Sequence, residues 1–63
     1  MKITLKAARV NKNLTQQEVA DKLKVSKHTI INWEKGKTKV PFASLTVLCQ
    51  LYNCNINNIK RGS

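Results

Sequence analysis

Hydrophobic residues recur along this chain every three or four positions, and no stretch alternates between apolar and polar residues as a surface strand does. Four segments show this spacing: 5–12, 16–23, 26–36 and 42–52. It places the apolar side chains of each segment on one face of a helix. In the last segment that face consists of Phe42, Leu45, Leu48, Cys49 and Tyr52. With a short fifth helix at 55–59, the pattern predicts an all-α fold, a compact five-helix bundle.

Polar residues at the ends of these segments predict where the helices begin and end. Thr4 can cap the first helix, and Thr15 followed by Glu18 makes a capping box at the start of the second. Ser26 can cap the third helix, which we expect to end at Gly36. The other signals are Asn13 and Asn53, which can end helices, Pro41 for the first turn of the fourth helix, and Asn55 as the cap of the fifth.

The two short helices within residues 16–35 have the features of a helix-turn-helix. Ala20 lies midway along the first of them, where a larger side chain would push the second away. Val25 fills the turn, and Ile30 and Trp33 face inward from the second helix. Spacing alone also fits an ordinary helical hairpin.

The opposite face of the helix after Ser26 is unusual for a solvated surface because an isoleucine lies near its centre. At about 100° per residue, that face carries Lys27, His28, Ile31, Asn32 and Lys35. A DNA major groove accounts for these residue types. Asn pairs with adenine, Lys with guanine, and an aliphatic group contacts a thymine methyl. A lone exposed apolar residue of the ordinary kind is the alternative for Ile31.

Composition adds a polyanion to the candidate partners. The 63 residues include 12 Lys and Arg against 3 Asp and Glu, a net charge of +9. A chain of this length buries only about 60% of its unfolded surface, so we expect one domain, residues 1–63, without a deep cleft. Nucleic acid and an anionic membrane both suit the charge. The sequence has neither a strongly basic amphipathic helix nor an apolar run of membrane or signal-peptide length. We therefore expect a cytoplasmic protein with no membrane partner.

Catalytic and metal-binding residue types are scarce. One His and three acids are present, with no nucleophile beside a base, so we expect neither enzymatic activity nor a small-molecule substrate. Cys49, Cys54 and the distant His28 do not have the spacing of a four-ligand zinc site. The two cysteines are expected to be reduced, small apolar residues. No metal or other cofactor is expected.

From about Thr4 to Ile59 the chain resembles XRE-like helix-turn-helix regulators of the Cro/lambda-repressor type. The segment that carries this resemblance is LTQQEVADKLKVSKHTIINWEKGKTKVP, residues 14–41. The resemblance implies a lambda-repressor-like DNA-binding fold and a sequence-specific, double-stranded-DNA-binding transcriptional regulator. A short phage or prophage repressor acting by operator occupancy is the nearest type. The alternative is a protein–protein adaptor that binds an antirepressor, a toxin or another regulator.

The resemblance also implies roles for individual residues. Those expected to contact bases are Lys27, His28, Ile31 and Asn32. Those expected to contact the DNA backbone are Gln16, Gln17, Ser26, Lys35, Lys37 and Lys39. The structural residues are Ala20, Val25, Ile30 and Trp33, together with Arg9 and Glu34, which match a pair that forms a salt bridge between two helices.

One position departs from the family pattern. Many members have Gly where this chain has Lys24, at a left-handed turn. A Lys there costs roughly 1 kcal/mol if its φ is positive.

A weak homodimer that uses the C-terminal helices, with Ile56 and Ile59 as its apolar contacts, is a further expectation.

Overall fold

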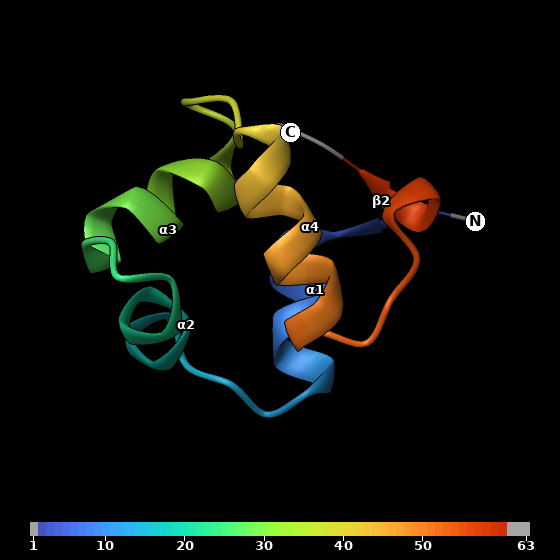
Figure 1. The fold of residues 1–63 in the computed structure, drawn as a ribbon, viewed down its shortest axis with the longest axis horizontal. Helices are drawn as coiled ribbons and strands as arrows, with labels where there is room; N and C mark the ends of the chain where they lie inside the picture. The colour runs from blue at the N-terminus through green and yellow to red at the C-terminus, as the bar shows by residue number, and fades with distance from the viewer. Residues whose placement is uncertain (1, 61–63) are drawn as a thin grey trace.

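The computed structural model describes residues 2–60, and Met1 and residues 61–63 of the expected domain lie outside this part. Helices α2 (Gln16–Leu23) and α3 (Lys27–Lys35) lie at one end of the molecule and the paired strands at the other, with α1 (Leu5–Asn11) and α4 (Phe42–Leu51) between them (Figure 1). No helix within residues 2–60 has the length and apolar content needed to cross a membrane. The elements in order are β1 (Ile3–Thr4), α1 (Leu5–Asn11), α2 (Gln16–Leu23), α3 (Lys27–Lys35), α4 (Phe42–Leu51), η1 (Ile56–Asn58) and β2 (Ile59–Lys60).

Side-chain caps begin the first three α-helices where the sequence predicts them. The hydroxyl oxygens of Thr4, Thr15 and Ser26 each accept a hydrogen bond from the backbone N–H three residues later, at 3.0–3.2 Å. Glu18 completes the predicted capping box by accepting from the Thr15 N–H at 2.8 Å. These bonds satisfy N–H groups that have no partner inside a helix. Helix α4 differs, because Pro41 occupies its N-cap and supplies no side-chain bond.

Each α-helix contributes at least two side chains to one apolar core. Ala20 is fully buried on α2, which packs against α3, so a larger side chain has no room there. Tight packing of this kind makes core positions sensitive to volume. The buried apolar residues are Leu5, Ala8, Val19, Ala20, Ile30, Trp33, Val40, Leu45, Leu48, Cys49, Tyr52 and Ile59.

The C-terminal segment corrects the expected count of five helices. The chain after α4 forms only η1, a single 3-10 turn of three residues. Asn55 does cap this turn, but it accepts from the N–H of Asn57, two residues on, at 2.8 Å. A bond at that spacing closes a tight Asx turn and does not begin an α-helix. The expectation of an all-helical C-terminus is therefore wrong, although the fold remains helical in the main.

A short β-pair replaces the end of the expected fifth helix. Strands β1 and β2 pair in parallel, with Ile3 opposite Ile59. Pairing requires an extended backbone, so Ile59 cannot continue a helix. The expectation that the chain has no strand is wrong because two residues are too short to show an alternating pattern.

Phe42 is the one residue of the predicted inward stripe on α4 that faces solvent. Its exposed fraction is 64%, whereas Leu45, Leu48, Cys49 and Tyr52 are buried. Val40, at 3% exposed, occupies the core just before the helix begins. The periodic stripe therefore extends one turn beyond the edge of the core, and the prediction that Phe42 faces inward is wrong.

The two cysteines are free thiols, with Cys49 buried and Cys54 half-buried. Burial, followed by the neighbouring Cys54 thiol, raises the pKa of Cys49 to about 11. Cys49 therefore stays protonated at neutral pH and packs as a small apolar side chain, as predicted.

Candidate nucleic-acid interface

A three-residue connection sets the angle between α2 and α3. Lys24 adopts the left-handed conformation, with φ 59° and ψ 42°. The N–H of Val25 donates to the carbonyl of Ala20 at 3.0 Å, and Val25 packs partly buried against the core. Ser26 then caps α3. The left-handed residue is therefore a lysine, at a backbone conformation that glycine adopts without a steric penalty.

Helix α3 presents two chemically different faces. Ile30 and Trp33, at 2% and 6% exposed, hold the helix on the core. The residues expected to contact bases lie outside this stripe: Lys27 and His28 are exposed, and Ile31 and Asn32 are half-buried. Within residues 2–60, the Lys27, His28 and Asn32 side chains form no hydrogen bond or ion pair. Their donors and acceptors are thus available to a ligand.

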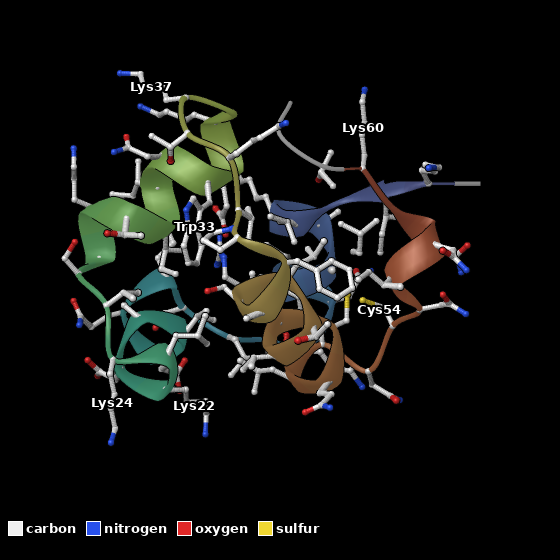
Figure 2. All side chains as sticks on the ribbon, turned by 45° about the horizontal axis from the view of Figure 1, so that its top comes forward. Lys22, Lys24, Trp33, Lys37, Cys54 and Lys60 are labelled. Carbon is white, nitrogen blue, oxygen red and sulfur yellow. The ribbon has the colours of Figure 1, made fainter. Side chains whose placement is uncertain are left out.

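Three exposed lysines follow or end this helix: Lys35, Lys37 and Lys39. Gly36 ends α3 in the left-handed conformation at φ 76°, and the N–H of Lys37 donates to the Asn32 carbonyl at 3.0 Å. Figure 2 shows the Lys37 side chain extending away from the body of the molecule. In the described part of the chain the one ion pair is Arg9–Glu34, so these cations are not neutralised by a carboxylate.

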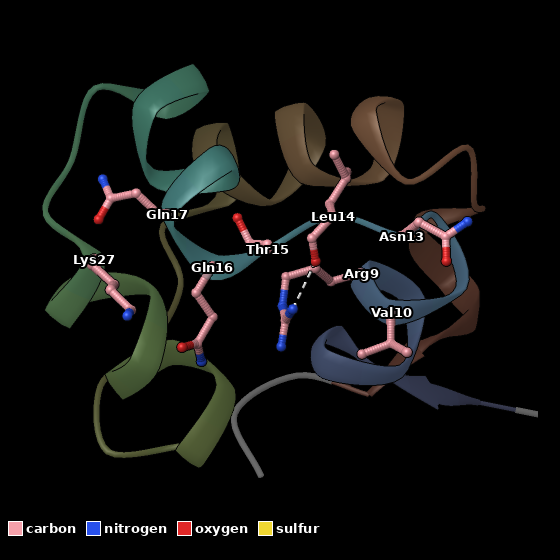
Figure 3. Close-up of a pocket in the computed structure, with 8 residues that line it drawn as sticks. All are labelled: Arg9, Val10, Asn13, Leu14, Thr15, Gln16, Gln17 and Lys27. Atoms are coloured by element: carbon pink, nitrogen blue, oxygen red, sulfur yellow. Dashed lines mark hydrogen bonds between the residues drawn. The ribbon is translucent and has the colours of Figure 1, made fainter.

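The Glu34 carboxylate is the point at which α1, α2 and α3 meet. Arg9 donates to it through Nε at 2.7 Å and through Nη2 at 3.3 Å, which is the predicted salt bridge. Gln16 donates to the same carboxylate through Nε2 at 3.0 Å. The remaining guanidinium nitrogen of Arg9 donates to the Leu14 carbonyl at 2.7 Å (Figure 3). The bond from Gln16 was not predicted, because it depends on how α2 crosses α3.

The other two polar residues expected at the DNA backbone also have partners. Gln17 is exposed and donates to Asp21, one turn along α2, at 2.9 Å. The hydroxyl of Ser26 lies 3.0 Å from the hydroxyl of Thr29, in addition to capping α3. These bonds fix both side chains locally.

An open cavity of about 450 Å³ lies at the start of α2 and reaches the start of α3. Gln16 and Gln17 line it from α2, and Lys27 lines it from α3 (Figure 3). Figure 3 shows the Lys27 and Gln16 side chains extending into the same space. The fold thus brings residues expected at bases and at phosphates to one concave surface, with a positive charge at its edge.

Comparisons with known proteins agree with this geometry. A protein-family model described as "Helix-turn-helix" matches residues 5–59. The chain is 34% identical over 58 residues to the HTH-type transcriptional activator BcrR of Enterococcus faecalis. The match covers 92% of this chain and 28% of BcrR, so the chain spans little more than a quarter of that relative. No solved structure matches the chain significantly.

Proposed function

The chain belongs to the helix-turn-helix family, and on that premise we propose that it binds double-stranded DNA sequence-specifically and regulates transcription. The observation that carries the proposal is the outer face of α3, where Lys27, His28 and Asn32 have no partners within residues 2–60. Such a surface can read bases, because its polar groups have no partners in the described part of the chain and the opposite face of the helix packs on the core. The name of the relative BcrR, a transcriptional activator, supports a regulatory role.

In the proposed complex α3 enters the major groove. The carboxamide of Asn32 pairs with adenine, and Lys27 donates to the O6 and N7 acceptors of guanine. His28 bonds a base edge or a phosphate. Ile31 rests its exposed part on a thymine methyl. An ordinary half-buried surface residue would instead leave base preference unchanged when truncated.

The DNA backbone is proposed to contact residues on both sides of α3. Gln16, Gln17 and Ser26 lie at the start of α2 and α3, where helix N-termini favour phosphate. Lys35, Lys37 and Lys39 supply the charge on the other side. If each subunit neutralises about four to six phosphates, log K falls against log[salt] with a slope of roughly −4 to −5.

The test is titration of fluorescently labelled duplex DNA with the purified protein at several salt concentrations, after selection from a randomised duplex pool. We expect an enriched sequence and a steep salt dependence. A flat salt response contradicts DNA binding.

A protein–protein adaptor is the second candidate function. It is favoured by the exposed apolar side chains of Phe42 and Val47 on α4, which are 64% and 45% exposed. Failure to enrich any duplex, together with binding of a partner at those residues, would support it.

We further propose repression by operator occupancy, in the manner of a short phage or prophage Cro-type regulator. A protein on an operator that overlaps a promoter excludes polymerase. The resemblance of residues 14–41 to that class supports this assignment. A reporter driven by the selected site tests it: repression is expected, and activation would place the chain with its activator relative.

A weak homodimer is the final part of the proposal. One domain of this type buries only about 600–1,000 Å² on DNA, so two copies on half-sites about 34 Å apart are expected. Ile59 cannot contribute, because it is 2% exposed and lies in β2. The exposed apolar residues of α4 support the contact instead. Sedimentation analysis with and without DNA tests it, and the selected site should be a palindrome.

A further inference from the structure

The arrangement around Glu34 concerns DNA binding as well as stability. Its side chain is 5% exposed and accepts bonds from Arg9 on α1 and from Gln16 on α2. Gln16 is half-buried, yet it also lines the open cavity at the start of α2, which the end of α1 borders and Lys27 of α3 reaches. One carboxamide therefore contacts the buried ion pair on one side and the proposed phosphate surface on the other.

The chemistry of the two groups fixes the direction in which the carboxamide points. A carboxylate only accepts hydrogen bonds, whereas a Gln side chain has two N–H donors on Nε2 and an acceptor on Oε1. Because Nε2 donates to Glu34 at 3.0 Å, a flipped amide would place oxygen against oxygen. The group is planar, so its second N–H also has a fixed direction. That N–H has no partner within residues 2–60.

Arg9 makes this arrangement compatible with a nearby phosphate. Its bonds at 2.7 and 3.3 Å neutralise the Glu34 carboxylate, which would otherwise repel a second anion. Its third nitrogen, Nη1, donates a hydrogen bond to the Leu14 carbonyl. Arg9 thus neutralises the carboxylate, and although Arg9 also lines the cavity, all three of its guanidinium nitrogens donate to protein acceptors.

We propose that Glu34 is a positioning residue for DNA binding: its carboxylate, neutralised by Arg9, orients the Gln16 carboxamide so that the second N–H donates to a backbone phosphate. The inference rests on the proposed function. Gln17 provides the contrast, because its carboxamide is bonded to Asp21 on the exposed surface of the same helix and has no link to Glu34.

Side-chain amide NMR of the free protein tests the orientation without DNA. A hydrogen bond of about 1 kcal/mol slows exchange about fivefold, so one Nε2 proton of Gln16 should exchange at least about fivefold more slowly than those of exposed Gln50. In the Glu34→Gln variant this difference should shrink, because a neutral amide oxygen accepts a weaker bond than a carboxylate and the new amide can also present an N–H to Gln16. Equal exchange at Gln16 and Gln50 in the unmodified protein would overturn the proposal.

A double-mutant cycle on the selected duplex tests the consequence for binding. Gln16→Met, which removes the carboxamide with both its N–H donors, should weaken binding about tenfold, as loss of a bond to a charged group predicts. Glu34→Gln should cost about as much alone but less than about twofold when Gln16→Met is already present. Losses that multiply independently would overturn the proposal. Gln50→Met, on exposed α4 surface, is the matched control and should leave binding unchanged.

Folding is measured for every variant by circular dichroism, so that affinity is compared only among folded proteins. If Glu34→Gln unfolds, Glu34→Asp replaces it, since it keeps a negative charge near Arg9 while withdrawing the carboxylate from Gln16. An unmodified protein that binds no duplex overturns both proposals. An unmodified protein that binds, with independent losses, overturns only the positioning role.

Discussion

The helix-turn-helix segment, residues 15–36, and the C-terminal segment, residues 41–60, enter the same core but are held by different interactions. The first has side-chain caps on both helices, a left-handed glycine at its end, and a carboxylate bonded to two other helices. The second begins without a side-chain cap, and α4 carries no charged residue. Its contribution is chiefly apolar: Leu45, Leu48 and Cys49 are all buried.

This difference reflects what each segment has to do. The hydrophobic effect is non-directional and does not by itself specify the orientation of a helix. Hydrogen bonds depend on distance and angle, so the caps fix where each helix begins and the bonds to Glu34 fix the position of α3 relative to α1 and α2. The helix proposed to read bases is the one held by directional bonds, whereas α4 needs only to cover the core. We therefore expect core substitutions in either segment to lower stability, and substitutions on the outer face of α3 to weaken DNA binding alone.

Removing a fully buried side chain should have the largest effect, and a similar one in both segments. Ile30→Ala on α3 and Leu45→Ala on α4 remove side chains that are 2% and 0% exposed. Each should lower the free energy of unfolding by about 2–5 kcal/mol, measured by urea denaturation. Ile31→Ala, at a half-buried position, is the control and should leave the fold intact. A Leu45→Ala loss far below that of Ile30→Ala would show that burial supports the two segments unequally.

Truncating the outer face of α3 should separate function from folding. Asn32→Ala should weaken binding to the selected duplex by about 1–3 kcal/mol and relax preference at one base pair. Lys37→Ala should weaken binding to all sequences and reduce the salt slope by about one. Titration at several salt concentrations measures both. Thermal midpoints should remain within a few degrees of the unmodified protein. Equal losses on selected and random DNA for Asn32→Ala would remove its base-reading role.

Features that depend on residues close together in the chain, or on family resemblance, could be predicted from the sequence. The caps at Thr15 and Ser26 depend on residues three positions away, so their spacing alone predicts them. The inward direction of Ile30 and Trp33 follows from helical period, and the Arg9–Glu34 pair from family resemblance.

Features set by distant parts of the chain were missed. The pairing of Ile3 with Ile59, the exposure of Phe42 and the bond from Gln16 to Glu34 each depend on where separate elements meet. No local pattern encodes those positions. The base and phosphate contacts remain predictions, because they depend on a partner molecule.

Tyr52 links the two segments electrostatically and should make stability fall in alkali. Burial, then the Glu34 carboxylate, raises its pKa to about 12 from 10.0, despite an opposing effect of Arg9. Well below pH 10 the tyrosine is protonated whether folded or not. Between pH 10 and 12 the unfolded state releases its proton first, so stability decreases as pH rises, by roughly 2 kcal/mol at most. Urea denaturation at pH 9 to 11.5 should show a steeper loss than in Tyr52→Phe. Parallel losses would exclude this linkage.

The smallest expected effect concerns the residues that end helices in the left-handed conformation. The ends of α1 and α4 are followed by Asn13 and Asn53, at φ 57° and 53°, whereas α2 ends with Lys24 at φ 59°. Asparagine tolerates this conformation because its short side chain bonds locally, and lysine does not.

Lys24→Gly should therefore stabilise the protein by about 1 kcal/mol, which raises the melting temperature by about 4–8 °C in a domain of this size. Asn53→Gly, the matched change in the C-terminal segment, should give less. Calorimetry of both variants checks the order. Because the Lys24 side chain is exposed, a destabilised Lys24→Gly variant would mean that its aliphatic stem or charge contributes more than the backbone strain costs. The Lys24 side chain would then stabilise the connection between α2 and α3, just as side-chain hydrogen bonds stabilise the rest of the helix-turn-helix segment.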